Sequence, residues 1–211
     1  MQIKKQNKYP MACLRDYRDA LYSCLVQLNP QFCMEIGTHI GATTEIFCDY
    51  FDNFRKDGFL VTGDVKEYKK INNPRVRQIL VKSHLPYEEL KKNHDLLEEK
   101  DVNYSENSQY INDILFWQQL QKTCKTDKFQ FIFIDGDHTR NSVEKDFNLS
   151  LNLLAEDGYI LLDDVPSNLE CSEFYYDSIK PKKEFECYEF EDEEWYKGVG
   201  AILIKPTKIP N

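Results

Sequence analysis

Two strongly apolar segments in the second half of the chain each end in acidic residues. The first spans residues 129–134 and is followed by Asp-Gly-Asp-His at positions 135–138, and the second spans residues 159–162 and is followed by Asp163 and Asp164. The apolar periodicity of residues 141–156 predicts one amphipathic helix between them. A strand, a crossover helix and a second strand form a right-handed unit with parallel strands, so all four acids are predicted at one edge of a sheet.

The carboxyl edge of an open α/β sheet is the place where such folds bind ligands. Four acids gathered there repel one another unless a cation, a proton or a positively charged ligand relieves the repulsion. The sequence therefore predicts a charged site at this edge.

The composition of the chain argues against several kinds of binding partner. The chain has 211 residues and a net charge of −9, which argues against nonspecific binding to nucleic acids or to anionic membranes. No apolar run approaches the length of a membrane span, and residues 1–10 are polar and rich in lysine, unlike a signal peptide. Seven scattered cysteines, an odd number without a C-x-x-C pair, indicate reduced thiols, no zinc site and a cytoplasmic protein.

The remaining sequence alternates strand and helix patterns without an internal repeat or a linker. We predict a single domain over residues 1–211, with an N-terminal helix within residues 1–30 and a helical insertion at residues 86–127. A polar connector is expected at residues 166–180. Strands that alternate with helices and close in a hairpin predict an α/β fold with a mostly parallel sheet and one antiparallel edge. The further strands are predicted at residues 32–36, 59–62, 76–81, 184–190 and 199–204.

A short segment with two glycines, Glu35-Ile-Gly-Thr-His-Ile-Gly41, follows the first predicted strand. A turn of this kind lets a ligand approach the backbone at a helix N-terminus. The spacing is not that of the dinucleotide fingerprint, so a tight turn without a ligand stays open as an alternative. Asp64 ends the second strand, where an acid can accept hydrogen bonds from both ribose hydroxyls of an adenosine-containing ligand. A solvated loop aspartate is the alternative there.

Four further features occur in a fixed order along the chain: MEIGTHIGATT (residues 34–44), Gly63-Asp64, FIDGDH (residues 133–138) and GYILLDD (residues 158–164). These segments resemble those of class I S-adenosylmethionine-dependent methyltransferases, and the most similar branch is that of the macrocin-type sugar O-methyltransferases. The resemblance covers residues 31–165 and the closing hairpin that ends at Lys205. It implies a Rossmann-like, seven-stranded, mostly parallel sheet with an antiparallel last strand and helices on both faces.

The resemblance also implies S-adenosylmethionine as the cofactor and a set of residues that bind it. The turn after the first strand would surround the methionine part, Asp64 would hold the ribose, and Ser83 would lie beside the adenine. His39 departs from the pattern, because the wider class often has a third glycine at that position. The implied cofactor-binding residues are Glu35, Gly37, Thr38, Gly41, Asp64, Ser83 and Asp135.

In the macrocin-type branch, acids matching Asp135, Asp163 and Asp164 bind a divalent metal, and the acid matching Asp137 is the general base. Mg²⁺ prefers oxygen ligands, and a bound metal lowers the pKa of a hydroxyl group, which suits methyl transfer to a sugar or a phenol. We include His138 as a second catalytic candidate. The alternatives are a helix cap for Asp137, a loop position for His138, and solvated loop acids for Asp163 and Asp164.

The sequence thus predicts a cytoplasmic, metal-assisted O-methyltransferase that acts on a small hydroxylated molecule, with no nucleic-acid or membrane partner. A homodimer is left open, and a noncatalytic nucleoside-binding protein of the same fold is one alternative. Residues 135–139 also match the D-x-D-x-T motif of haloacid-dehalogenase-type phosphatases, and an Asp-x-Asp glycosyltransferase would use similar carboxylates. Only one predicted helix separates Asp135 from Asp163, however, and the phosphatase interpretation leaves the glycine turn unused.

Overall fold

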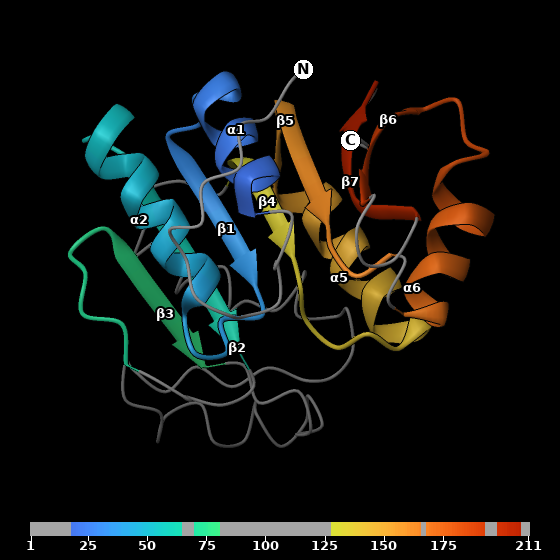
Figure 1. The fold of residues 1–211 in the computed structure, drawn as a ribbon, viewed down its shortest axis with the longest axis horizontal. Helices are drawn as coiled ribbons and strands as arrows, with labels where there is room; N and C mark the ends of the chain where they lie inside the picture. The colour runs from blue at the N-terminus through green and yellow to red at the C-terminus, as the bar shows by residue number, and fades with distance from the viewer. Residues whose placement is uncertain (1–17, 65–69, 81–127, 166–167, 193–197, 208–211) are drawn as a thin grey trace.

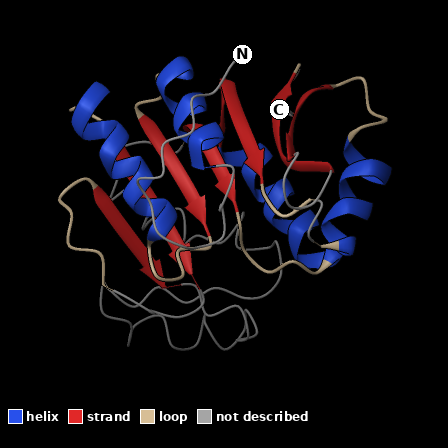
Figure 2. Cartoon of the chain, in the orientation of Figure 1, coloured by secondary structure: helices blue, strands red, loops and turns tan. Residues whose placement is uncertain are grey.

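The computed structural model describes residues 18–64, 70–80, 128–165, 168–192 and 198–207. Within these residues the chain forms a seven-stranded sheet in the order β3-β2-β1-β4-β5-β7-β6 (Figure 1). The strands β1 to β5 are parallel to one another, and β7 is antiparallel to both of its neighbours (Figure 2). The strands are β1 (Phe32–Ile36), β2 (Phe59–Asp64), β3 (Val76–Leu80), β4 (Phe129–Ile134), β5 (Leu154–Leu162), β6 (Phe185–Asp192) and β7 (Gly198–Pro206).

This architecture confirms the predicted mostly parallel sheet with an antiparallel last strand. The hairpin predicted at an antiparallel edge is that of β6 and β7. β7 lies inside the sheet, between β5 and β6, and β6 forms the edge. The hairpin of β6 and β7 therefore joins the sheet through its second strand.

Helices cover both faces of the sheet and produce two separate cores. On one face lie α1 (Arg18–Leu28) and α2 (Ala42–Phe54), and on the other lie α5 (Arg140–Leu153) and α6 (Leu169–Phe174) (Figure 1). Successive side chains of a strand point to opposite faces, so a central strand must be apolar throughout. In β4, Phe131 and Phe133 enter the core beneath α1 and α2, while Ile132 and Ile134 enter the other core.

Two predicted boundaries are wrong. The helix predicted over residues 141–156 ends at Leu153, and β5 begins at Leu154 rather than at Tyr159, because Leu154 pairs with Phe129 across a register shift. The connector predicted at residues 166–180 contains α6 and a π-helix at Tyr175–Ile179.

Several predicted segments lie wholly or partly outside the described residues. They include the insertion at residues 86–127, the first part of the N-terminal helix and the turn between the last two strands. Among the helices that are described, none combines the length and the apolar character that a membrane crossing requires.

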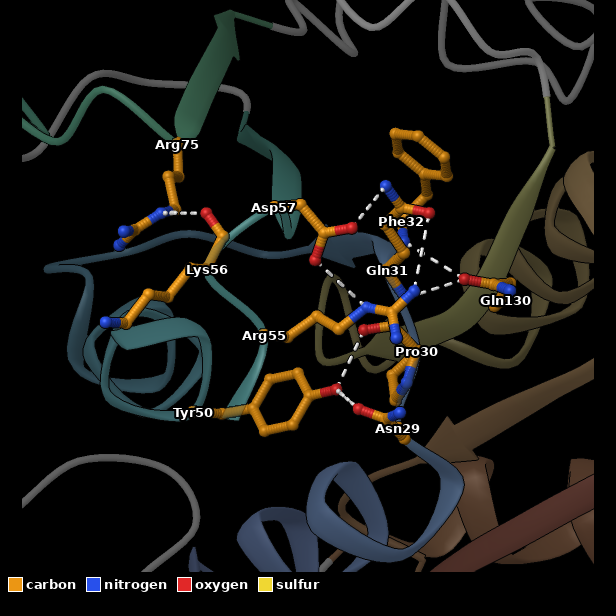
Figure 3. Close-up of polar contacts among 10 residues, drawn as sticks. All are labelled: Asn29, Pro30, Gln31, Phe32, Tyr50, Arg55, Lys56, Asp57, Arg75 and Gln130. Carbon is orange, nitrogen blue, oxygen red and sulfur yellow. Dashed lines mark hydrogen bonds and ion pairs between the residues drawn. The ribbon is translucent and has the colours of Figure 1, made fainter. Parts of the chain in front are cut away.

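Polar side chains at the amino edge of the sheet, where the parallel strands begin, are paired with one another (Figure 3). The Gln130 side-chain oxygen accepts hydrogen bonds from the backbone N–H groups of Gln31, at 2.6 Å, and of Phe32, at 3.3 Å. The carboxylate of Asp57 accepts a hydrogen bond from the Gln31 amide at 3.0 Å and lies 3.2 Å from Arg55 Nε. These contacts tie the beginnings of β1 and β4 to the loop before β2.

Candidate active site

The turn between β1 and α2 is built around glycine. Gly37 has φ 98°, and a Cβ atom placed on it would lie 1.8 Å from the carbonyl oxygen of Asp135. Its N–H donates a hydrogen bond of 2.8 Å to the carbonyl oxygen of Gly63 at the end of β2. Because a side chain at position 37 would collide with the backbone after β4, only glycine lets this turn pack between the neighbouring strand ends.

His39 and Asp64 meet at the tip of the same turn. His39 has φ 44°, in the left-handed region that the expected glycine would adopt more easily. Its backbone N–H donates a hydrogen bond of 2.6 Å to Oδ2 of Asp64. The carboxylate at the end of β2 is therefore held directly beside the turn.

Glu35, the penultimate residue of β1, is fully buried in a network of hydroxyl groups. Its Oε2 accepts hydrogen bonds from the hydroxyls of Thr44 and Thr62. The Thr62 hydroxyl lies 2.6 Å from that of Thr38, and since Thr62 donates to Glu35, Thr38 must donate to Thr62. Thr44 and Thr62 were not predicted, although the parallel pairing of Glu35 with Thr62 follows from aligning the two strands.

The second carboxylate oxygen of Glu35, Oε1, is buried, and none of the described residues donates a hydrogen bond to it. Burial raises the pKa of Glu35 to about 8, and the hydrogen bonds from Thr44 and Thr62 oppose this only in part. A buried polar atom without a partner is uncommon in folded proteins and calls for an explanation.

Asp135, His138 and Asp164 form a compact cluster at the ends of β4 and β5. His138 Nε2 lies 2.9 Å from Oδ2 of Asp164 and 3.5 Å from Oδ1 of Asp135. One potential ligand atom from each of the three residues lies within 4.8 Å of the other two. Hydrogen bonds to Asp135 and Asp164 raise the pKa of His138 to about 10, while burial raises the pKa of Asp135 to about 6. The imidazolium thus serves as the cation of this acidic cluster.

Asp164 itself has φ 58°, which is unusual for a residue other than glycine. Such a conformation costs on the order of 1 kcal/mol and persists where surrounding contacts enforce it. The carboxylate of the same residue lies 2.9 Å from His138 Nε2.

Asp163 lies next to the cluster but is not among its three ligand-bearing residues. Its side chain is buried, and within the described part of the chain no group forms a hydrogen bond with its Oδ2. Burial and the nearby charges of Asp135 and Asp164 raise its pKa well above the usual range. Of the three predicted metal ligands, Asp135 and Asp164 thus belong to the cluster together with His138, while Asp163 lies beside it.

Asp137 is directed toward the start of α5. Its carboxylate accepts hydrogen bonds from the Ser142 hydroxyl at 2.8 Å and from the Thr139 hydroxyl and backbone N–H, at 3.1 and 3.3 Å. Burial acts to raise its pKa, but these hydrogen bonds prevail, and the pKa is lowered. The N-cap of α5 is Thr139, whose hydroxyl accepts a hydrogen bond from the Ser142 N–H.

The predicted cofactor-binding residues that the structure describes lie on three adjacent strand ends. Glu35, Gly37, Thr38 and Gly41 come from β1 and its turn, Asp64 from β2, and Asp135 from β4. Ser83 lies outside the described residues. The arrangement joins a glycine turn, which could receive a nucleoside-bearing ligand, to a cluster that could hold a cation.

Residues 34–165 match a family model described as a methyltransferase domain. No curated protein matches the sequence significantly.

Solved structures with the same fold include two O-methyltransferases. TomG from Streptomyces achromogenes, involved in tomaymycin synthesis and bound to S-adenosylmethionine, is 11% identical with a TM-score of 0.55, and the match covers 95% of this chain and 82% of TomG. An O-methyltransferase from Bacillus cereus bound to S-adenosylhomocysteine is 16% identical with a TM-score of 0.56 and coverages of 94% and 83%. A candidate caffeoyl-CoA O-methyltransferase from Staphylococcus aureus is 18% identical with a TM-score of 0.52 and coverages of 94% and 87%. At identities this low, the likeness to these structures shows the shared fold alone.

Proposed function

Because the chain belongs to the methyltransferase-domain family, within the class I S-adenosylmethionine-dependent enzymes, we propose that it transfers a methyl group to a hydroxyl oxygen of a small molecule such as a sugar or a phenol. One observation carries this proposal. Gly37 packs against the backbone of Asp135, and the Asp135 carboxylate belongs to the acidic cluster. A cofactor seated on the glycine turn would therefore lie next to a site suited to a hydroxylated acceptor. The proteins of the same fold named as O-methyltransferases support an oxygen acceptor.

The cofactor would be held by groups that face the turn. Glu35, Gly37, Thr38 and Gly41 would surround its methionine part, and Asp64 would accept hydrogen bonds from the ribose hydroxyls. The position of the Asp64 carboxylate, 2.6 Å from the His39 N–H, supports this role. Ser83 remains the candidate for contact with the adenine.

A divalent metal, Mg²⁺ being the candidate because the donors are carboxylate oxygens, fits the acids at the ends of β4 and β5. Asp135, Asp163 and Asp164 would hold it, and the unpaired Oδ2 of buried Asp163 is the kind of atom that a cation would satisfy. When bound, the metal would act as a Lewis acid and lower the pKa of the acceptor hydroxyl. We propose that these three ligands match those of the macrocin-type branch.

Two residues compete for the role of general base. Asp137 would have to give up hydrogen bonds from Thr139 and Ser142, and its lowered pKa makes it a weak proton acceptor. His138 faces the cluster with Nε2. Once the negative charges of Asp135 and Asp164 are neutralised, the His138 imidazole would lose its proton. It could then accept a proton from the acceptor hydroxyl. We therefore favour His138 as the base and leave Asp137 as the second candidate.

The transfer itself is an in-line displacement. The acceptor oxygen loses its proton to His138 Nε2 and forms a bond to the methyl carbon, while the bond from that carbon to the sulfonium sulfur breaks and leaves S-adenosylhomocysteine. The cationic donor and the anionic oxygen neutralise each other, so alignment and exclusion of water are the main tasks of the protein.

Calorimetric titration of S-adenosylhomocysteine into the purified protein, with Mg²⁺ and again with chelator, tests the cofactor assignment. We expect micromolar affinity for the wild type and a loss of at least tenfold for Asp64→Ala. The matched control is Asp57→Ala at the amino edge, which should bind as the wild type does. Absence of binding would favour the phosphatase or the glycosyltransferase instead, and phosphate release from an aryl phosphate would identify the phosphatase.

A second experiment separates an enzyme from a noncatalytic binding protein. Mass spectrometry would follow methyl transfer to a panel of sugars and phenols, with Asp135→Asn as the inactive comparison. Binding of S-adenosylhomocysteine without transfer to any acceptor, and without measurable affinity for Mg²⁺ or Mn²⁺, would support the binding protein.

A further inference from the structure

The segment that carries His138 and the segment that follows Asp164 are joined by contacts outside the acidic cluster. The backbone N–H of Arg140, two residues after His138, donates a hydrogen bond of 2.7 Å to Oε2 of Glu170 in α6. The Arg140 guanidinium donates to Oδ2 of Asp177 at 3.0 Å and to the Ser178 hydroxyl at 3.4 Å. One residue of α5 is thus tied to both the α-helical and the π-helical part of the segment after β5.

The same segment also contacts the two cluster residues through their backbones. The Cys171 thiol donates a hydrogen bond to the carbonyl oxygen of His138, with a distance of 3.6 Å from Sγ to oxygen. The backbone N–H of Asn168 donates to the carbonyl oxygen of Asp164 at 3.1 Å. The start of α6 therefore touches both sides of the cluster.

The cluster needs such support because neither of its loops is a regular element. Asp164 has the left-handed backbone conformation described above, and His138 lies in the loop between β4 and α5. The contact of 2.9 Å between His138 and Asp164 depends on how these loops are held relative to each other.

We propose that Glu170 and Arg140 are positioning residues that hold the His138 loop against the segment after Asp164, and so set the arrangement of the metal-binding carboxylates. This inference rests on the proposed function. Glu170 acts through a backbone N–H in the first turn of α5, which has no partner within its own helix. Arg140 acts through its side chain on Asp177 and Ser178.

An ordinary surface ion-pair network is the competing explanation. Arg140 and Asp177 have side chains that are 38% and 61% exposed, and exposed ion pairs contribute little to stability. The two explanations therefore differ in what they predict for metal affinity. If the contacts are a surface network, removing them leaves the metal affinity unchanged. If the residues are positioning residues, removing them alters the metal affinity at nearly constant stability.

The experiment compares Glu170→Leu with Glu170→Gln by calorimetric titration of Mn²⁺. Both variants lose the same negative charge, but only glutamine keeps an oxygen that can accept from the Arg140 N–H. We expect Glu170→Leu to weaken Mn²⁺ binding about tenfold, Glu170→Gln to restore most of the affinity, and Arg140→Leu to weaken binding severalfold. Glu156→Leu, an equal change of charge at an exposed site where β5 begins, is the control and should bind Mn²⁺ as the wild type does.

Affinity for S-adenosylhomocysteine and the unfolding midpoint are measured on the same variants, and both should remain close to the wild-type values. Equal Mn²⁺ affinity of Glu170→Leu, Glu170→Gln and wild type would overturn the inference and leave the proposed function standing. Equal losses in Glu170→Leu and Glu170→Gln would also overturn it, because charge alone would then explain the effect. Absence of Mn²⁺ binding by the wild type would overturn it together with the proposed metal site, whereas absence of S-adenosylhomocysteine binding would refute the proposed cofactor.

Discussion

Charged and polar groups are paired differently at the two edges of the sheet. At the amino edge, Asp57 faces both Arg55 and an amide of Gln31, and Gln130 satisfies two backbone N–H groups (Figure 3). At the carboxyl edge, Glu35 and Asp163 are buried, and each has a carboxylate oxygen that no described residue contacts by a hydrogen bond. A buried polar group left unpaired costs about 1–3 kcal/mol. At the amino edge, Arg55 Nε also lacks a hydrogen bond among the described residues but lies in an ion pair with Asp57, whereas the carboxyl edge keeps carboxylate oxygens that a ligand could satisfy.

This comparison predicts that equivalent changes at the two edges have different consequences, and glycine replacement should show the largest effect. Gly37→Ala places a Cβ against the Asp135 carbonyl at positive φ, so we expect a loss of about 3 kcal/mol in the free energy of unfolding. S-adenosylhomocysteine binding should become undetectable by calorimetry.

The matched change at the amino edge is Gly58→Ala, whose Cβ would lie 2.1 Å from the Phe51 ring. It should lower the free energy of unfolding by about 2 kcal/mol through overpacking and leave the ligand affinity of the folded protein unchanged. If both variants lose ligand affinity equally, the division between the edges is wrong.

The second prediction concerns the pH dependence of stability. The pKa of Glu35 is raised from 4.5 to about 8 in the folded protein, so between these values the folded state holds a proton that the unfolded state has lost. The contribution of Glu35 to the free energy of unfolding is therefore present below pH 4.5. It is lost as the pH rises toward 8, with a slope of up to about 1.4 kcal/mol per pH unit. Glu35→Gln should remove this part of the slope in denaturant unfolding between pH 5 and 8. A variant with the wild-type slope would show that Glu35 does not titrate in this window.

The third prediction concerns a smaller effect, a gain in the free energy of unfolding, whereas an ordinary core substitution lowers it. Asp163→Asn removes a buried acid close to Asp135 and Asp164, so we expect the metal-free protein to gain about 1 kcal/mol at pH 9. The same variant should bind Mn²⁺ at least tenfold more weakly. Chemical denaturation and Mn²⁺ titration of one preparation provide both values, and a destabilised variant with normal Mn²⁺ affinity would contradict the comparison.

The smallest effect is expected for the amino edge. Gln130→Leu deprives the N–H groups of Gln31 and Phe32 of their acceptor, but water can partly replace it because the site is exposed. The free energy of unfolding should fall by about 0.5–1 kcal/mol, with unchanged S-adenosylhomocysteine affinity. Loss of that affinity would mean that the amino edge also shapes the ligand site.

The central strands could be predicted from the sequence because burial on both faces leaves long apolar runs. The strand predicted at residues 32–36 has the observed bounds of β1, and the run over residues 129–134 is β4. The start of β5 could not be predicted, because Leu154, Ala155 and Glu156 favour a helix and only pairing with β4 makes them extended.

The helical segment after β5 was missed although its signals are present. Asn168 caps α6 by accepting hydrogen bonds from the N–H groups of Glu170 and Cys171. The buried residues Cys171, Phe174 and Tyr175 follow at helical spacing. The surrounding polar residues obscured this stripe.

The candidate site was predicted as a set of residues at one sheet edge, and its internal pairing was not. Whether Asp137 turns toward the cluster or toward α5 depends on the rotation of one loop, which sequence spacing does not determine. The proximity of His138 to Asp164 likewise depends on the left-handed backbone at Asp164. Unusual backbone conformations of this kind lack a reliable signal in residues other than glycine.

The location of β7 has a consequence for the order in which the chain can be assembled during synthesis. β5 and β6 are both made before β7, yet each pairs with β7 rather than with the other. Until residues 198–206 leave the ribosome, the nascent chain must keep the flank of β5 unpaired, and an unpaired strand edge can recruit other chains. Any delay in the release of these residues from the ribosome should therefore promote aggregation.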